Sequence, residues 1–557
     1  MLNWYDLDND RLWGDVMDTN NYKQKILNNK TFLGIELGST RIKAILIDDE
    51  ANIILKSAYN WENKYENSFW TYDLNEAVEG VKKVYKLIKD QIINLYGITL
   101  TSLGAIGISG MMHGLIALDE KNKLLTPFRT WKNSNTGEAR KIMIDAFEYN
   151  IPHRWSSAHL LQSVIGKEDY VNNLSYMTTL SGYIHFLLTG EKVLGIGDAS
   201  GMFPIDYKSK KYNQPMIEKF NNILNKYGLS INIEDLLPSV KVAGESAGYL
   251  TPEGAKLLDP DGDLESGIFM APPEGDAETG MIATNAIKPK TGNISVGTSI
   301  FSMIVLERDL QKYYEEIDIV ATPNGYPVAM VHANNGMSEF DSWLKIFKEY
   351  IADLGLNVED KDLYEYFYKK TMQADPHCGN LMSYNIQAGE PIIGVELGRP
   401  MLIRKEDSKF NLSNLLMSIL YSTIATIRIG QDILTVNEGV HIETIVAHGG
   451  AFNTKGGMQK ITAAGLNVPV DVYSSAGEGG SWGMALLTLY AKENRNQKLN
   501  EFLNQKVFNE LEKQSEQADQ EMVNGFNTYL ERYKKALEVV KEAESRFWFI
   551  GSICPTL

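Results

Sequence analysis

Two segments far apart in the chain repeat one pattern. GIELGSTRIKAILIDDE begins at Gly34 and GNISVGTSIFSMIVLERD begins at Gly292, and they align when Gly38-Ser39-Thr40 is placed on Gly297-Thr298-Ser299. Each segment reads as an apolar strand, a turn of glycine and two hydroxyl residues, a second apolar strand and an acidic end. One such segment is an ordinary hairpin, but each of these opens one half of the chain. The repeat therefore predicts a duplicated α/β domain.

Length and composition set limits on the class of protein. The 557 residues exceed what one core holds, and 44% hydrophobic residues suffice for two cores. A net charge of −17 argues against a general nucleic-acid or anionic-membrane binder. With only Cys378 and Cys554, a disulfide framework or a cysteine zinc site is not expected. No membrane span or signal peptide is predicted, so we expect a soluble cytoplasmic protein.

The periodicities divide the chain into four parts. Residues 1–30 are predicted to be a polar N-terminal extension, 31–285 and 286–492 the two duplicated domains, and 493–557 a helical C-terminal extension. A long apolar helix is expected over about 411–437. The tail from about 497 to 546 is charged and amphipathic at helical spacing, which predicts an added helical layer or a contact surface.

The glycine-hydroxyl turns suit anion binding. Backbone N–H groups and side-chain O–H groups can donate to an anion, and glycine lets the backbone approach closely. Two facing turns could hold the phosphates of one nucleotide from both sides. A third glycine-rich stretch, AHGGAFNTKGG (447–457), follows a predicted strand and precedes a helix, where open α/β sheets bind ligands. It lacks the P-loop pattern and a complete G-x-G-x-x-G fingerprint, so taken alone it favours a loop.

Two acids stand beside these elements. Asp276 lies in APPEGDAETGM (271–281), where it can cap a short helix, act as a general base in a cleft, or do both. Glu36 lies at the end of the first strand, either as a surface charge or facing something positive.

These elements, in this order, resemble the FGGY carbohydrate kinases of the actin-like sugar-kinase ATPase superfamily. GIELGSTRIKA resembles their first phosphate motif, GNISVGTSIFSMIV the second, and VAHGGAFNTKGGMQKITAAGLNVPV the adenosine motif. GAIGISGMMHGLIALDE is similar to the xylulokinase segment that carries a sugar-contacting Met-His-Gly loop, and GDASGMFPID is similar to another family signature. The resemblance covers about residues 31–490 and implies two duplicated actin-like (RNase H-like) ATPase domains around a central cleft.

The resemblance also implies roles for individual residues. Asp276 is the expected catalytic base, and the expected sugar contacts are Met112, His113, Trp131, Lys132 and Asp276 itself. ATP is expected to be bound by Gly38, Ser39, Thr40, Lys43, Gly297, Thr298, Ser299, Gly449, Gly450, Ala451 and Asn453. Glu36 is expected to face hydrated Mg²⁺, where the family usually has Asp.

The expected reaction is ATP-dependent phosphorylation of a ketopentose such as xylulose or ribulose. The sequence departs from the xylulokinase pattern at Met111, which replaces Gln, and at TWKNSNT, which lacks Trp-Asn-Asp; the Asp-Ala of GDAETGM is closer to ribulokinase. Two alternatives remain open: a catalytically weak or inactive relative that senses sugar or nucleotide, and an actin-like ATPase acting on protein partners. A small-molecule sugar is the expected partner, with no nucleic acid and no membrane, and a homodimer is an open possibility.

Several of these residues also have purely structural interpretations. His113 can be a loop histidine hydrogen-bonded to backbone, and Trp131 can serve packing alone. Asp198 and Asp206 are predicted to be turn or cap residues. Glu278 and Glu478 follow predicted helix starts and are expected to serve the helix dipole, and the C-terminal helices are expected to be a solvated face.

Overall fold

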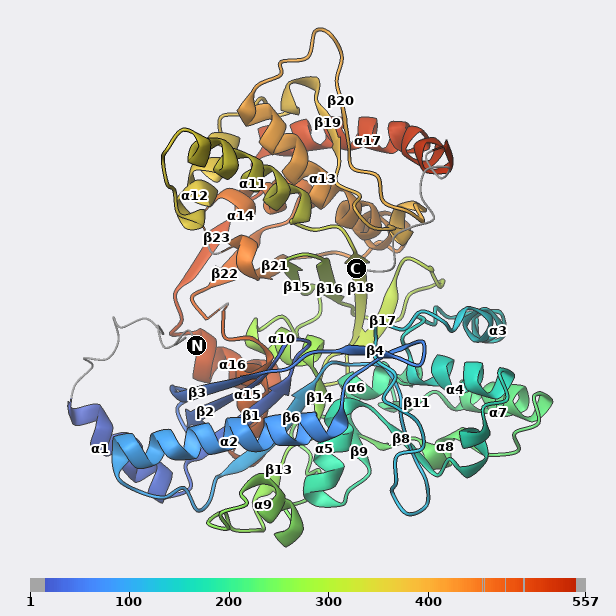
Figure 1. The fold of residues 1–557 in the computed structure, drawn as a ribbon, viewed down its shortest axis with the longest axis vertical. Helices are drawn as coiled ribbons and strands as arrows, with labels where there is room; N and C mark the ends of the chain where they lie inside the picture. The colour runs from blue at the N-terminus through green and yellow to red at the C-terminus, as the bar shows by residue number, and fades with distance from the viewer. Residues whose placement is uncertain (1–15, 453, 455, 476, 494–495, 547–557) are drawn as a thin grey trace.

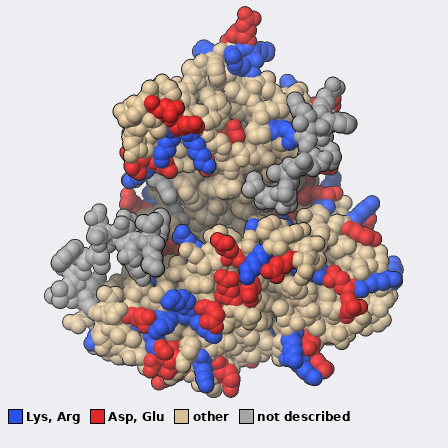
Figure 2. Space-filling view, in the orientation of Figure 1, with Lys and Arg blue, Asp and Glu red and all other residues tan. Residues whose placement is uncertain are grey.

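The computed structural model describes residues 16–452, 454, 456–475, 477–493 and 496–546, which form two lobes joined at a waist (Figure 1). Each lobe is built on one mixed β-sheet. Figure 2 shows a recess between the lobes on the face that it presents.

The two sheets share one strand order. The lower sheet runs β3-β2-β1-β6-β13, with β14 also paired to β6, and the upper sheet runs β17-β18-β16-β15-β21-β22-β23. In each lobe three strands are antiparallel neighbours, β3-β2-β1 in the lower sheet and β18-β16-β15 in the upper. The next two strands run parallel to β1 or β15, namely β6 and β13 in the lower sheet and β21 and β22 in the upper. The predicted duplication is therefore confirmed.

The lower-sheet strands are β1 (Thr31–Leu37), β2 (Arg41–Asp48), β3 (Ile53–Asn60), β6 (Ala105–Gly110), β13 (Phe269–Met270) and β14 (Glu274–Gly275). The upper-sheet strands are β15 (Thr291–Val296), β16 (Ile300–Val305), β17 (Asp318–Ala321), β18 (Pro327–Ala333), β21 (Thr444–His448), β22 (Val470–Tyr473) and β23 (Lys513–Glu516).

The lower sheet is covered on both faces, which explains why its strands are almost continuously apolar. On one face lies α2 (Leu74–Tyr96), which begins at the N-cap Asp73 and ends at Gly97 in the left-handed region (φ 63°). The remaining helices of this half are α1 (Val16–Leu27), α3 (Gly137–Phe147), α4 (Ser156–Ile165), α5 (Leu180–Thr189), α6 (Ile196–Ser200), α7 (Gln214–Lys226), α8 (Ile233–Leu236) and α9 (Pro252–Leu258). Its short strands are β4 (Lys64–Glu66), β5 (Phe69–Thr71), β7 (Ile116–Leu118), β8 (Tyr176–Thr178), β9 (Val193–Gly195), β10 (Ile205–Asp206), β11 (Lys211–Tyr212) and β12 (Ser239–Lys241).

A central helical layer joins the two lobes. It consists of α10 (Asp276–Ala283), α15 (Gly479–Glu493) and α16 (Leu499–Leu503), and one apolar cluster combines these helices with side chains from both sheets. Although α15 comes late in the chain, it packs on β1 and β6 of the lower lobe (Figure 1). The approach is close: a Cβ added at Gly34 would lie 2.2 Å from the Ser481 carbonyl oxygen.

The upper lobe is built around a buried helix. The predicted apolar helix is α13 (Leu412–Asp432), continued by a π-helical turn over Ile433–Asn437. Its length and composition would allow a membrane span, but 83% of its most apolar window is buried inside the protein. It is therefore a core helix. The other elements of this lobe are α11 (Ser338–Asp353), α12 (Asp360–Thr371), β19 (Met382–Tyr384), β20 (Met401–Ile403), α14 (Gly457–Leu466) and α17 (Gln520–Arg546).

The C-terminal tail differs from its prediction in two ways. The wholly helical prediction for 497–546 was wrong, because β23 forms there and pairs antiparallel with β22. Its polar sequence, KQSE, suits an edge strand. The solvated face predicted for the tail is only half correct, because α17 buries aromatic side chains, including Phe526 and Tyr529, in the upper core.

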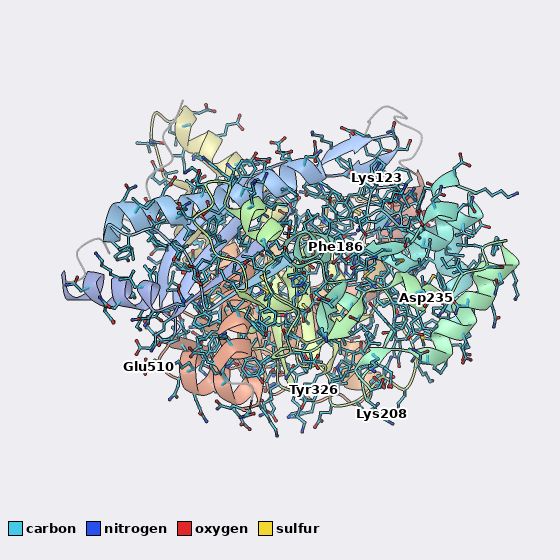
Figure 3. The ribbon with its side chains drawn as sticks, turned by 90° about the horizontal axis from the view of Figure 1, so that it is seen from below. Lys123, Phe186, Lys208, Asp235, Tyr326 and Glu510 are labelled. Carbon is cyan, nitrogen blue, oxygen red and sulfur yellow. The ribbon has the colours of Figure 1, made fainter. Side chains whose placement is uncertain are left out.

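The edge strand β17 attaches the upper sheet to the lower lobe. The Ala321 N–H donates to the Ser200 hydroxyl at 3.0 Å, which joins β17 to α6. The turn that follows β17 continues this contact. Figure 3 shows Tyr326 of that turn on the same edge of the molecule as Lys208. The two segments are joined by a hydrogen bond in which the Lys210 ammonium donates to the Asn324 carbonyl at 2.9 Å. The lobes are thus connected beside the recess as well as through the central layer.

The close packing of α15 on β1 yields a stability prediction. Gly34→Ala places a methyl group against the backbone of α15, where nothing flexible can move aside. We expect a loss of about 3 kcal/mol, the upper end of the usual cost of overpacking, measured by urea unfolding. Gly280→Ala is the matched control, because a Cβ there meets no atom within 4 Å. Equal stabilities of the two variants would contradict the packing argument.

Candidate active site

The turn between β1 and β2 has its carbonyl groups held from behind. The Trp61 indole N–H donates to the Gly38 carbonyl at 2.7 Å, and the Tyr72 hydroxyl donates to the Ser39 carbonyl at 2.8 Å. Both rings are buried, with centroids 4.4 Å apart. Among the described residues, the exposed hydroxyls of Ser39 and Thr40 have no protein partner. The turn therefore offers donors, rather than acceptors, to a ligand.

The carbonyl groups of the turn between β15 and β16 are also hydrogen-bonded, but by backbone N–H groups. The N–H groups of Met337 and Gly336 donate to the carbonyls of Gly297 and Thr298, each at 2.8 Å. Thr298 is exposed, and Ser299 is half-buried. The two turns occupy equivalent positions in the two sheets and present the same kind of donor.

The third glycine-rich stretch lies beside the second turn. Strand β21 runs parallel to β15, with His448 opposite Ser295. Gly449 follows in the left-handed region (φ 99°), and a Cβ there would lie 2.9 Å from the Val296 carbonyl oxygen. Gly450 is exposed, and the Ala451 carbonyl accepts from the Tyr368 hydroxyl at 3.3 Å. Asn453 lies outside the described residues.

A cavity of about 400 Å³ adjoins this stretch, between α12 and the start of α14. Its lining residues are Lys361, Glu365, Tyr368, Lys369, Met372, Thr454, Gly456, Gly457 and Lys460. None of these is Asp276 or one of the predicted sugar contacts, so the cavity lies apart from those residues.

Asp276 is placed at the beginning of α10 by the short strand β14. Gly275 is the N-cap residue, so the N-cap interpretation of Asp276 was wrong by one position. The half-buried Asp276 carboxylate accepts from the Ala277 N–H at 3.0 Å and from the Met112 N–H at 3.3 Å. Burial, and next the charge of Glu36, raise the pKa of Asp276 to about 7, while the Met112 N–H opposes this shift. A base with such a pKa is well matched to neutral conditions.

The sequence left open whether Glu36 is a surface charge or faces a positive group. In the structure Glu36 is half-buried and faces positive groups. It lies opposite Lys43 in the β1–β2 register, and the Ser481 N–H at the start of α15 donates to its carboxylate at 3.2 Å. Burial raises the pKa of Glu36, and the Lys43 charge partly offsets the effect. In the described chain, no three His, Cys, Asp or Glu side chains gather to hold a metal ion.

Three buried acids lie behind Asp276, and sequence reasoning assigned two of them wrongly. Asp198 accepts from the hydroxyls of Thr179, at 2.6 Å, and Ser181, and is no turn or cap residue. Glu278 is fully buried, and its carboxyl oxygens have no partner among the described residues, so it does not serve the helix dipole at a surface. Glu274 accepts from the Asp198 N–H at 3.0 Å.

Burial is the main cause of the pKa shifts in this group. It raises the pKa of Asp198 to about 6 and the pKa values of Glu274 and Glu278 well above the usual range. Burial therefore favours the neutral, protonated forms of the two glutamates. The signal in the sequence was their unusual setting among apolar and small residues, in GIGDAS and PPEGDAETG. Asp206, by contrast, is the turn residue that was predicted, since it accepts from the Lys208 N–H at 3.3 Å.

The predicted sugar contacts divide into two groups. Met112 and His113 follow β6, and the Met112 hydrogen bond joins them to Asp276. His113 is buried in the left-handed region (φ 71°), with Nδ1 3.4 Å from the Gly201 carbonyl, and burial lowers its pKa well below the usual value. Trp131 and Lys132 are exposed, and the Lys132 ammonium lies 4.8 Å from the centre of the Trp70 ring. Within the described chain these two have no hydrogen bond to Asp276, and their sugar role stays a prediction.

Comparison with known proteins decides the family. Residues 31–261 match the model of the N-terminal domain of the FGGY family of carbohydrate kinases, and residues 292–492 match that of its C-terminal domain. The chain belongs to the FGGY family of carbohydrate kinases. It is accordingly a phosphotransferase that acts on a small-molecule sugar with ATP as phosphate donor.

Individual relatives are distant. The xylulose kinase of Haemophilus influenzae is 21% identical over 421 residues, which cover 72% of this chain and 79% of that protein. The structure of a ligand-bound xylulose kinase from Lactobacillus acidophilus is 17% identical with a TM-score of 0.76, over 93% of this chain and 99% of that one. Gluconate kinase from the same organism is 16% identical with a TM-score of 0.74, over 93% and 99%. These structures support the two-domain sugar kinase fold.

The environment of Asp276 predicts a pH profile. Because the base must be ionised, kcat/KM for the sugar should fall about tenfold for each pH unit below about 7. Glu36→Gln removes a negative charge and should move this acidic limb to lower pH. Steady-state kinetics between pH 5 and 9 measure both effects. Two results would contradict the coupling of Asp276 and Glu36. One is a fall of wild-type kcat/KM only near pH 4, and the other is a fall at the same pH in wild type and Glu36→Gln.

Proposed function

We propose that this FGGY kinase transfers the γ-phosphate of ATP to a hydroxyl of a ketopentose such as xylulose or ribulose. The observation that carries the proposal is the hydrogen bond between the Met112 N–H and Asp276, because it joins the predicted sugar loop to the predicted base. The named xylulose kinases among the relatives favour a ketopentose. The cytoplasmic location and the homodimer expected from the sequence remain predictions.

The two turns and the Gly449 stretch would bind ATP. Donor groups of Ser39 and Thr40 on one lobe, and of Thr298 and Ser299 on the other, suit the phosphates, since their carbonyls are already occupied. Gly449 lies beside the second turn, which suits the adenosine side of one bound nucleotide. Lys43, opposite Glu36 in the sheet, would lie close to the transferred phosphate.

The residues present fit a hydrated Mg²⁺ ion. The charge of Glu36 raises the pKa of Asp276, so two carboxylates face a common region where a divalent cation would relieve their repulsion. Mg²⁺ keeps several waters and takes few protein ligands, which agrees with a site built on Glu36 rather than on a cage of acids. When bound, the ion would neutralise charge on the phosphates.

The chemical step requires little covalent help from the protein. The sugar hydroxyl oxygen bonds to the γ-phosphorus, the bond to the bridging oxygen of ADP breaks, and the Asp276 carboxylate takes the hydroxyl proton. Met112 and Ala277 hold the carboxylate through their N–H groups. Closure of the two lobes over the bound sugar would keep water, the competing acceptor, away from the phosphate.

A substrate panel tests the proposal. ADP release is measured with ketopentoses, hexuloses, polyols and sugar acids, and Asp276→Asn should lower kcat by about 10²- to 10⁴-fold because the base is lost. Asp206→Asn is the control, since Asp206 is an acid in a surface turn. Preference for a sugar other than a ketopentose would contradict the substrate assignment. Sugar binding without turnover in the wild type would favour the sensor alternative.

The metal role of Glu36 has its own test. Glu36→Gln should raise the half-saturating Mg²⁺ concentration about tenfold, because it removes the charge while keeping the shape. Glu36→Asp, which restores the acid that the family usually carries, is the control and should retain the Mg²⁺ response. If Glu36→Gln leaves both the rate and the Mg²⁺ dependence unchanged, the carboxylate does not serve the metal.

A further inference from the structure

Glu390 is a buried acid in the upper lobe that the proposed chemistry does not use. It lies between β19 and β20, and its backbone forms a β-bridge with Val395. One carboxylate oxygen accepts three hydrogen bonds: from the Asn334 N–H at 2.9 Å, from the Asn335 N–H at 3.2 Å and from the Asn335 side-chain amide at 3.0 Å. Glu390 is 0% exposed, so these bonds compensate for the loss of water at that oxygen, while the other carboxyl oxygen has no partner among the described residues.

The two asparagines join the loops on either side of them. The Asn334 side chain donates to the Gly389 carbonyl at 2.7 Å, and the Asn335 side-chain oxygen accepts from the N–H groups of Gln387, at 2.8 Å, and Ala388, at 2.9 Å. The segment that follows β18 is therefore fastened along its length to the loop that carries Glu390.

The next two residues hold the second turn. Gly336 and Met337 are the donors to the Thr298 and Gly297 carbonyls. The segment and the turn are in close contact, since a Cβ added at Gly336 would lie 2.2 Å from the Gly297 carbonyl oxygen. On the other side, the Thr423 hydroxyl of α13 lies 3.3 Å from the Gly336 carbonyl and donates to it. The turn thus rests on a short segment held between Glu390 and the core helix.

We propose that Glu390 is a positioning residue for nucleotide binding: it holds residues 334–337, which in turn hold the carbonyls of Gly297 and Thr298 away from the phosphates. The inference rests on the proposed role of Gly297, Thr298 and Ser299 as a phosphate-binding turn. Without the carboxylate, two half-buried backbone N–H groups, those of Asn334 and Asn335, lose their acceptor, and the turn is free to rotate its carbonyls toward the anion.

Direct binding measurements test this proposal. The affinity for the non-hydrolysable ATP analogue AMP-PNP with Mg²⁺ is measured by calorimetry, together with sugar affinity and melting temperature. Glu390→Ala should weaken nucleotide binding about tenfold, which corresponds to about 1.4 kcal/mol. Glu390→Gln should stay within about threefold, because the amide oxygen can accept from the same N–H groups. Glu396→Ala, an exposed glutamate of the same loop, is the matched control. Sugar affinity should be unchanged in all three variants.

A further variant separates failure of this inference from failure of the proposed function. A Cβ at Gly297 meets only the Ser299 carbonyl oxygen, at 3.9 Å, so Gly297→Val should fold and occupy the space beside the turn. If Gly297→Val abolishes AMP-PNP binding while Glu390→Ala leaves it unchanged, the role of Glu390 is wrong and the phosphate turn stands. If neither variant weakens binding, both are wrong.

A second variant keeps the proposal testable if Glu390→Ala does not fold. If Glu390→Ala is insoluble, Asn335→Ala replaces it with the same expected outcomes, because it removes the side-chain bonds to Glu390, Gln387 and Ala388. A lower melting temperature with unchanged nucleotide affinity would show a purely structural role and overturn the proposal.

Discussion

The site depends on where the peptide carbonyls of two turns point. A backbone turn carries acceptors as well as donors, so it attracts an anion only when its carbonyls are bonded elsewhere. In the lower lobe the partners are the Trp61 and Tyr72 side chains, and in the upper lobe they are backbone N–H groups of residues 336 and 337. The duplicated halves thus keep the same electrostatic result with unrelated partners, and the sheets, helices and loops around them keep those partners in place.

Acidic side chains are concentrated around Asp276. Asp276 lies near Glu36 on one side and near Asp198, Glu274 and Glu278 on the other. Burial is the first cause of each raised pKa and favours the neutral forms, while nearby N–H groups and the Lys43 charge oppose this shift at Asp276 and Glu36. The free-energy cost of burying the inner acids is thereby limited.

Features that depend on a local sequence pattern could be predicted from the sequence. The hairpin repeat predicted two sheets of one topology, and the short stretch around Asp276 predicted an acid at a helix start, although Gly275 rather than Asp276 proved to be the cap. Contacts between distant segments left no such pattern. Glu390 meets Asn335 across 55 positions, and Ser481 meets Glu36 across 445. Strand β23 was missed because an edge strand of four polar residues lacks apolar alternation.

The position of α15 has a consequence for how the chain is made. This helix covers β1 and β6, yet its first residue, Gly479, follows nearly the whole upper lobe in the sequence. During synthesis, the earliest sheet to emerge therefore keeps one apolar face uncovered until residues 479–493 have been added. The lower lobe therefore depends on a late segment of the chain to complete its apolar packing.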